Sequence, residues 1–223
     1  MSFNVELVGS TPRPALARRP TVFIVDNDAS VRESLKRVSR REGWDVEAFS
    51  SAQEFLSQAT VDGPGCLVVD LGPHGQSGLM LQHQMAQADS CVPIIFITSA
   101  GDVAMTVRAM KAGAADVLPR PVADEDLWSA MRGAFQSSEA ALRHEASRRT
   151  LRSRYDSLTP REQQVMGLVI SGLLNKQVGG ELGISEITVK AHRGQVMRKM
   201  GAESLPDLVR MAVRLSLPLA ATH

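Results

Sequence analysis

The sequence predicts an α/β domain with a doubly wound sheet of five parallel strands, followed by an all-α helix-turn-helix domain at the end of a long helical linker. Short β-branched runs alternate with helical spacings up to about residue 120, which is typical of parallel βαβ units. The helical pattern after the fifth run is longer than packing on one domain requires. Two later helical patterns flank Gly183, as in a helix-turn-helix.

Composition allows two small domains in the 223 residues and supplies a hydrophobic fraction of 43%, enough for a core. The net charge of +1 does not by itself indicate nucleic acid or a membrane, although residues 136–154 are rich in arginine. No apolar run reaches the roughly 18 residues of a membrane span. Residues 1–19 lack an apolar core, so we expect a mobile tail and not a secretion signal. Cys66 and Cys91 lack metal-ligand spacing and are expected to be small buried hydrophobes in the reducing cytoplasm.

The elements of the first domain follow from turn residues and apolar spacing. Gly43 and Gly113 are expected to end helices, and Ser51 with Glu54 forms a capping-box pattern. The expected strands are Thr21–Val25, Asp45–Phe49, Cys66–Asp70, Pro93–Ile97 and Ala115–Leu118. Helices are expected from Val31, from Ser51, from about Gly78, from Asp102 and from Asp124 toward Leu151.

Polar residues follow four of these strands, at what must be one edge of a parallel sheet. They are Asp26 with Asn27, then Asp70, Thr98 and Arg120. Carboxylate oxygens suit a hard cation such as Mg²⁺. A hydroxyl and a cation can hold phosphoryl oxygens while a carboxylate acts as the nucleophile. The pattern therefore indicates a phosphoryl site around Asp70.

The second domain has clear helix signals. Thr159, Pro160 and Glu162 form a helix start with a capping box. Asn175 is expected to cap a short helix, Lys176–Leu182, and Ser185 to cap the next, which ends before Gly201. A last helix is expected over about 204–215.

The helix after Ser185 carries two stripes. Its core-facing stripe is Val189, His192, Val196 and Met200, and we expect His192 to be packed or half-buried. The other stripe, suited to a DNA major groove, is Lys190, Ala191, Gly194, Gln195 and Arg198. Phosphate contacts are expected from Thr188, Arg193 and Lys199.

Residues 21–135 resemble a bacterial response-regulator receiver domain, a flavodoxin-like fold. The matching motifs are Val-Asp-Asn-Asp at 25–28, Val-Val-Asp-Leu at 68–71, Phe-Ile-Thr-Ser-Ala-Gly-Asp at 96–102 and Pro-Arg-Pro at 119–121. The resemblance implies that Asp70 is the phospho-acceptor and that Thr98 is the switching hydroxyl. It also implies a Mg²⁺ site formed by Asp26, Asp70 and the Gly72 carbonyl, with Asn27 as a further candidate ligand.

Four positions depart from the receiver pattern. Asn27 stands where the family has a second acid, Arg120 where it has lysine, Val117 where it has an aromatic and His74 where it usually has proline. The first change reduces the charge available to hold Mg²⁺. The second replaces a compact ammonium with a planar fork.

Leu158 to Val213 resembles the LuxR/NarL DNA-binding domain, in the FixJ-like branch of two-component regulators. The matching motifs include Leu-Thr-Pro-Arg-Glu at 158–162 and Thr-Val-Lys-Ala-His at 188–192. The resemblance implies base-reading positions at Lys190, Ala191 and Gly194. The predicted organisation is a tail at 1–19, a receiver at 20–135, a linker at 136–154 and a DNA-binding domain at 155–223.

Three functional hypotheses follow. The first is a cytoplasmic, non-enzymatic transcription regulator. A histidine kinase phosphorylates Asp70, and the receiver domain then controls the DNA-binding domain through dimerisation, so that a homodimer binds a double-stranded operator. The second keeps DNA binding but makes the first domain a phosphorylation-independent dimerisation or interaction module. The third is a flavodoxin-like cofactor enzyme, which the absence of a Ser/Thr-rich phosphate loop after the first strand and the 4% aromatic content disfavour.

Overall fold

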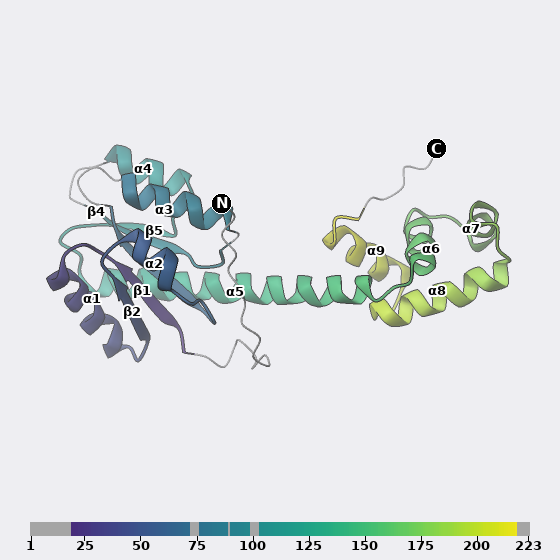
Figure 1. Ribbon diagram of the computed structural model, residues 1–223, viewed down its shortest axis with the longest axis horizontal. Helices are drawn as coiled ribbons and strands as arrows, with labels where there is room; N and C mark the ends of the chain where they lie inside the picture. Colours follow the sequence, from purple (N-terminus) through teal and green to yellow (C-terminus); the bar gives the residue numbers. More distant parts are fainter. Residues whose placement is uncertain (1–18, 72–75, 89, 99–102, 218–223) are drawn as a thin grey trace. The chain divides into compact units, whose positions relative to one another are not determined.

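The computed structural model describes residues 19–71, 76–88, 90–98 and 103–217. The chain divides into two compact units, residues 1–142 and 143–223. The division falls inside helix α5 (Asp124–Asp156), within the segment predicted to be a linker. Figure 1 shows the sheet of the first unit in purple to teal and the helical second unit in green to yellow. The predicted tail lies outside the described residues except for Arg19.

A parallel sheet forms the centre of the first unit, and its described strands run in the order β2-β1-β3-β4-β5. The register pairs Val25 with Val69 and Asp70 with Ile97, so the carboxyl ends of the strands lie at one edge. This order confirms the doubly wound prediction. The strands are β1 (Thr21–Val25), β2 (Asp45–Phe49), β3 (Gly65–Asp70), β4 (Ile94–Thr98) and β5 (Asp116–Pro119).

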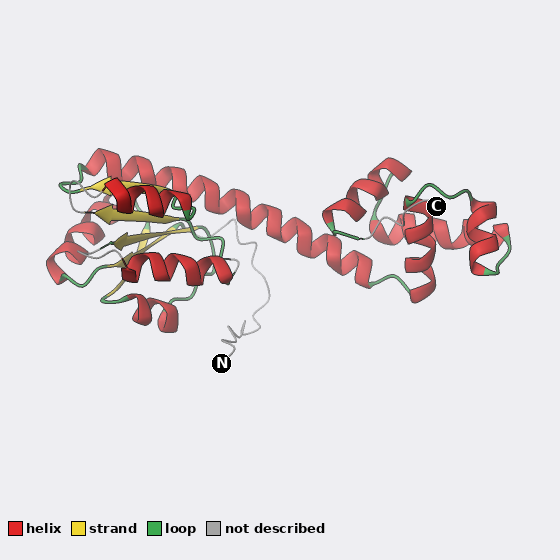
Figure 2. Ribbon diagram, turned by 90° about the horizontal axis from the view of Figure 1, so that it is seen from above, coloured by secondary structure: helices red, strands yellow, loops and turns green. Residues whose placement is uncertain are grey.

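Helices cover both faces of this sheet (Figure 2). One face packs Val22 and Ile24 against α1 and the first half of α5, and the other packs Phe23 and Val25 against α2, α3 and α4. Successive strand residues therefore alternate between two cores. Besides α5, the helices described in this unit are α1 (Ala29–Arg41), α2 (Ala52–Gln58), α3 (Gln76–Gln87) and α4 (Val103–Lys111).

Several local predictions can be compared with the structure. Strands β4 and β5 each begin and end one residue later than expected, and Pro93 has no N–H to donate to the ladder. Cys66 is buried, and burial raises the pKa of its thiol. Cys91 is half-buried, and both thiols are free. No described helix is both long and apolar enough to cross a membrane.

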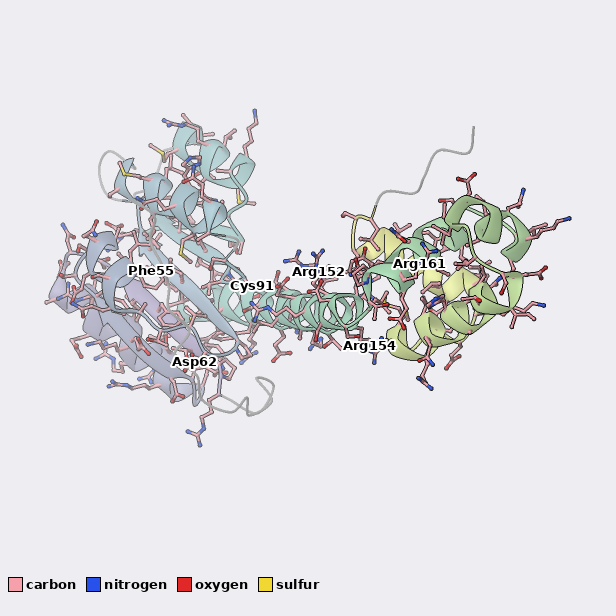
Figure 3. The ribbon with its side chains drawn as sticks, turned by 45° about the vertical axis from the view of Figure 1, so that its right-hand side comes forward. Phe55, Asp62, Cys91, Arg152, Arg154 and Arg161 are labelled. Carbon is pink, nitrogen blue, oxygen red and sulfur yellow. The ribbon has the colours of Figure 1, made fainter. Side chains whose placement is uncertain are left out.

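The second unit is a small helical bundle that includes the end of α5. Leu151 and Tyr155 of α5 pack with Met166, Met200 and Leu208 in one of its cores. Arg154 donates to the carbonyl of Met200, and Arg161 donates to that of Leu182 (Figure 3). Its other helices are α6 (Pro160–Ile170), α7 (Asn175–Leu182), α8 (Glu186–Met200) and α9 (Leu205–Arg214).

The caps of these helices are mostly those predicted. Thr159 and Glu162 form the expected capping box, and Ser185 caps α8. Gly183 has a φ of +64°, the left-handed conformation that ends α7. The prediction that Asn175 caps α7 was wrong, because the cap residue is Leu174. The Leu174 N–H donates to Gln177 Oε1 at 2.8 Å. Because Asn175 is not the cap residue, its side chain can bond to another partner.

Candidate functional sites

The edge of the sheet brings together the acidic residues predicted to form the phosphoryl site. Asp26 follows β1, Asp70 ends β3, Thr98 ends β4 and Arg120 follows β5. Nη2 of Arg120 lies 3.1 Å from Asp26 Oδ2 and 3.1 Å from Asp70 Oδ1. One guanidinium nitrogen thus joins two carboxylates that come from different strands.

Hydrogen bonds that involve the backbone hold Arg120 and Asp26 in place. The Arg120 N–H donates to the Thr98 carbonyl at 2.8 Å, which extends the β4–β5 pairing beyond the strands. The second Asp26 oxygen, Oδ1, accepts the Asp28 N–H at 2.8 Å, and Arg32 donates to the Asp26 carbonyl at 2.7 Å. Both carboxylate oxygens of Asp26 therefore already accept hydrogen bonds.

Exposure separates the two acids. The Asp26 side chain is 3% exposed, whereas that of Asp70 is 21% exposed. Asp70 is therefore the more accessible of the two carboxylates. Thr98 is buried beside it at the end of β4, and Val117 is a half-buried residue against the core on the α2–α4 face of the sheet.

The described side chains around Asp26 and Asp70 form no cluster of acids or histidines large enough to hold a metal ion by themselves. Within the described residues, no group of three or more His, Cys, Asp or Glu side chains could hold a metal ion. The Asp28 carboxylate caps α1 by accepting the Ser30 N–H at 2.7 Å, and the hydrogen bonds from Ser30 hold the pKa of Asp28 below its usual value. Asn27 is exposed. Gly72 and His74 lie outside the described residues.

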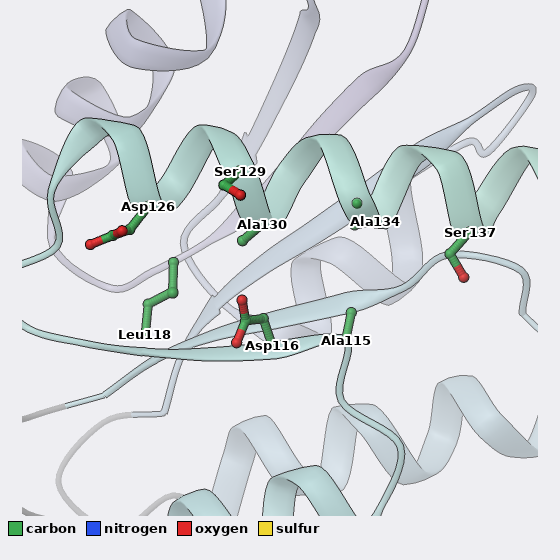
Figure 4. A pocket seen from close by; sticks show the side chains of 9 residues that line it. Ala115, Asp116, Leu118, Asp126, Ser129, Ala130, Ala134 and Ser137 are labelled. Carbon is green, nitrogen blue, oxygen red and sulfur yellow. The ribbon is translucent and has the colours of Figure 1, made fainter.

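A separate hollow of about 500 Å³ lies between β5 and α5. Figure 4 shows Asp116 of β5 facing the helix that carries Ser129, Ala130 and Ala134. Its lining contains the carboxylates of Asp116 and Asp126 and several small side chains, but no lysine, arginine or histidine. Its lining does not include Asp26, Asp70 or Arg120. It is therefore distinct from the acidic pocket, the name used below for these three residues at the edge of the sheet.

Helix α8 presents its predicted reading face to solvent. Lys190, Ala191, Gly194 and Arg198 are exposed. On the opposite side Val189, Val196 and Met200 are buried, and His192 is half-buried as expected. Thr188 is exposed, and its hydroxyl bonds to that of the cap residue Ser185. Four of the five residues of the predicted reading stripe are therefore exposed, and the fifth, Gln195, is half-buried.

Two predicted phosphate-binding residues have partners within the unit. Arg193 donates to Asn175 Oδ1 at 3.1 Å and thereby joins α8 to α7. Lys199 Nζ lies 2.6 Å from Oε2 of the buried Glu162, which also accepts the Thr159 N–H at 2.7 Å. These bonds lower the pKa of Glu162, with the Lys199 ammonium as the largest cause. Lys199 therefore has an ion-pair partner within this unit, and its role at a DNA phosphate stays a prediction.

Sequence reasoning missed one residue on the reading face. Ile187 is 80% exposed, an unusual state for a large apolar side chain. It lies three and four residues before Lys190 and Ala191, so it shares their face of the helix. That spacing is visible in the sequence and could have identified it.

Comparisons with known proteins identify a family for each of the two units. Residues 22–132 match the response regulator receiver domain, and residues 156–212 match the bacterial regulatory proteins of the luxR family. The chain is 46% identical to Nodulation protein W of Bradyrhizobium diazoefficiens over 91% of this chain and 88% of that protein. It is 38% identical to the transcriptional regulatory protein FixJ of the same species, over 88% of this chain and 96% of that one.

A solved structure shows the same two-part architecture. The response regulator StyR superposes with a TM-score of 0.76 and 44% identity, over 88% of this chain and 100% of that one. The family matches cover the acidic pocket in one unit and α8 in the other. The chain therefore belongs to the response regulators that combine a receiver domain with a luxR-family DNA-binding domain, and it is homologous to the FixJ transcription regulators.

Proposed function

We propose that Asp70 accepts a phosphoryl group from a phosphohistidine of a partner kinase. A carboxylate oxygen of Asp70 attacks phosphorus, the new P–O bond forms as the P–N bond breaks, and the imidazole leaves with the electron pair. The observation that carries the proposal is the position of Asp70 at the sheet edge, more exposed than Asp26 and beside a cation. The chain is thus a substrate of the kinase and not itself an enzyme.

Arg120 and Thr98 would stabilise the product. The guanidinium is already directed at Asp70, so it can donate to phosphoryl oxygens and offset their charge. The Thr98 hydroxyl would donate to a phosphoryl oxygen from the neighbouring strand. Receiver domains generally bind Mg²⁺ at the phosphorylation site. For this chain the site predicted from Asp26, Asn27, Asp70 and the Gly72 carbonyl stays a prediction, and the proposed roles do not depend on it.

Intact mass after incubation with acetyl phosphate tests the acceptor. Wild type should gain one hydroxylamine-labile phosphoryl group, with acetate as the leaving group, and Asp70→Asn should gain none. Asp116→Asn is a matched control, because Asp116 lies in the same domain and accepts a hydrogen bond from its neighbour Val117. An Asp70→Asn variant that still gains the group would contradict the assignment. A wild type that gains none would favour the phosphorylation-independent module.

We propose further that α8 enters the major groove of an operator. Lys190, Ala191 and Gly194 would face base edges, and Ile187 would contact a thymine methyl group. The support is the exposure of this face, together with the N-terminal position of its apolar and basic residues on the helix. Phosphate contacts would come from Thr188, Arg193 and Lys199.

A homodimer would place two such helices on two half-sites and raise affinity through linkage. The proposed partners, DNA and a kinase domain, place the protein in the cytoplasm. Selection from random double-stranded oligonucleotides tests the operator: a repeated half-site should be enriched, and enrichment should disappear for Lys190→Ala. Equal enrichment by both proteins would contradict the assigned face.

A further inference from the structure

The acidic pocket contains a positively charged group that belongs to the chain itself. Two carboxylates converge on Nη2 of Arg120, each at 3.1 Å. The Asp26 side chain is almost fully buried, and the guanidinium is only partly exposed. The Asp26 and Asp70 carboxylates both lie 3.1 Å from the same nitrogen. Without a cation between them, two such carboxylates would repel each other.

The remaining donors around the pocket leave Arg120 as the cation on these acids. Asp26 Oδ1 is bound to the Asp28 N–H. Arg32 donates to the Asp26 carbonyl and not to its carboxylate. Among the described residues, the ion pairs of Asp26 and Asp70 are both with Arg120.

A divalent metal bound between the two acids would meet the Arg120 guanidinium at Asp26 Oδ2 and Asp70 Oδ1. Mg²⁺ requires oxygen ligands at about 2.0–2.1 Å in near-octahedral geometry. A guanidinium bound to the same carboxylates repels such a cation and blocks the approach to Asp26 Oδ2 and Asp70 Oδ1. Metal and arginine therefore compete for one pair of acids.

We propose that the Arg120 guanidinium is the resident cation of this pocket, and that a divalent metal binds only after Arg120 leaves the two carboxylates. The backbone keeps Arg120 within reach of both acids, because its N–H is paired with the Thr98 carbonyl at 2.8 Å and holds the residue at the sheet edge. Arginine also suits this position, because its planar fork can bind two carboxylates while staying charged. This inference concerns the same site as the proposed function, but it needs no phosphoryl transfer.

Mn²⁺ binding to the full-length chain, followed by electron paramagnetic resonance, tests the competition. Arg120→Gln removes the cation and should bind Mn²⁺ at least about tenfold more tightly than wild type, a change of about 1.4 kcal/mol. Arg132→Gln is the matched control, because Arg132 pairs with a single surface acid, Glu42, at 2.6 Å. It should bind Mn²⁺ as wild type does. Adding Asp26→Asn to Arg120→Gln should abolish the gain.

Two results would overturn the proposal. One is wild-type Mn²⁺ affinity within twofold of the Arg120→Gln value, and the other is a gain that survives Asp26→Asn. A second experiment measures the thermal unfolding of wild type, so its main result does not depend on whether the Arg120→Gln variant folds. Mg²⁺ and EDTA should give the same Tm at equal ionic strength, and a saturable rise with Mg²⁺ that Asp26→Asn removes would also contradict the proposal. Because neither experiment uses a phosphoryl donor, their outcome is separate from that of the acetyl phosphate experiment.

Discussion

Two lysines of α8 should respond in opposite ways to substitution. Lys199 lies 2.6 Å from the buried Glu162 carboxylate and its side chain is 30% exposed, whereas Lys190 is 63% exposed and lies 3.4 Å from Glu186. Removing Lys199 takes its ammonium group away from the buried Glu162 carboxylate. Hydrogen bonds to charged groups contribute about 1.5–3 kcal/mol, so we expect Lys199→Met to destabilise the second unit by about that amount.

The loss of the Lys190 pair should cost much less. Exposed i,i+4 pairs contribute about 0.3–0.5 kcal/mol. Lys190→Ala should instead weaken binding to the selected operator by about 1–3 kcal/mol, the usual effect of one base contact. The two lysines therefore separate folding from DNA reading on a single helix.

Hydrogen exchange of α6 and α8 peptides in the full chain measures the first effect, since it reports local stability. Lys199→Met should speed exchange there by about ten- to a hundredfold. Tryptophan fluorescence should not change, because Trp44 and Trp128 both belong to the first unit. Affinity over a salt series measures the second effect. Native exchange in Lys199→Met would refute the structural role of Lys199, and a salt slope lowered by about one in that variant would support its proposed phosphate contact.

Three further outcomes are expected. Gly180→Ala should stabilise the second unit by about 0.5–1 kcal/mol, because a Cβ there meets no atom within 4 Å. Gly179→Ala should not give this gain in urea unfolding, because its Cβ would lie 2.8 Å from the Ile184 carbonyl oxygen. Replacing thymine by deoxyuridine in the selected half-site should weaken wild type at one position but not Ile187→Ala, and equal losses would exclude the methyl contact. The pKa of Glu162 is lowered by Lys199, so its stabilising effect is present above the unfolded-state pKa and lost as pH falls through the folded one. Glu162→Gln should flatten this part of the acid unfolding curve, and an unchanged curve would contradict it.

The pocket was predictable because strand ends in a parallel sheet share one edge. Asp70 and Thr98 end apolar runs in the sequence, Asp26 directly follows another, and Arg120 comes one residue after the run that ends at Leu118. That reasoning needs only the direction of each strand. It cannot give the position of a long side chain, so the bridge from Arg120 to both carboxylates required the structure.

The helix-turn-helix was predictable for a different reason. Thr159, Ser185 and Gly183 are local signals, and their bonds form within a few residues. Asn175 misled the prediction because its partner, Arg193, lies on another helix. Lys199 likewise reads as a basic surface residue until α6 places Glu162 beside it. In both cases a tertiary contact replaced the local role.

The DNA affinity of the phosphorylated chain tests the central claim most directly. Operator binding would be measured for wild type and Asp70→Asn, each with and without acetyl phosphate, with intact mass confirming the modification. Phosphorylation should tighten wild-type binding by at least about fivefold, the lower end of typical coupling between sites, and should leave Asp70→Asn unchanged. Fully phosphorylated wild type that binds the operator no more tightly than the unmodified protein would contradict it.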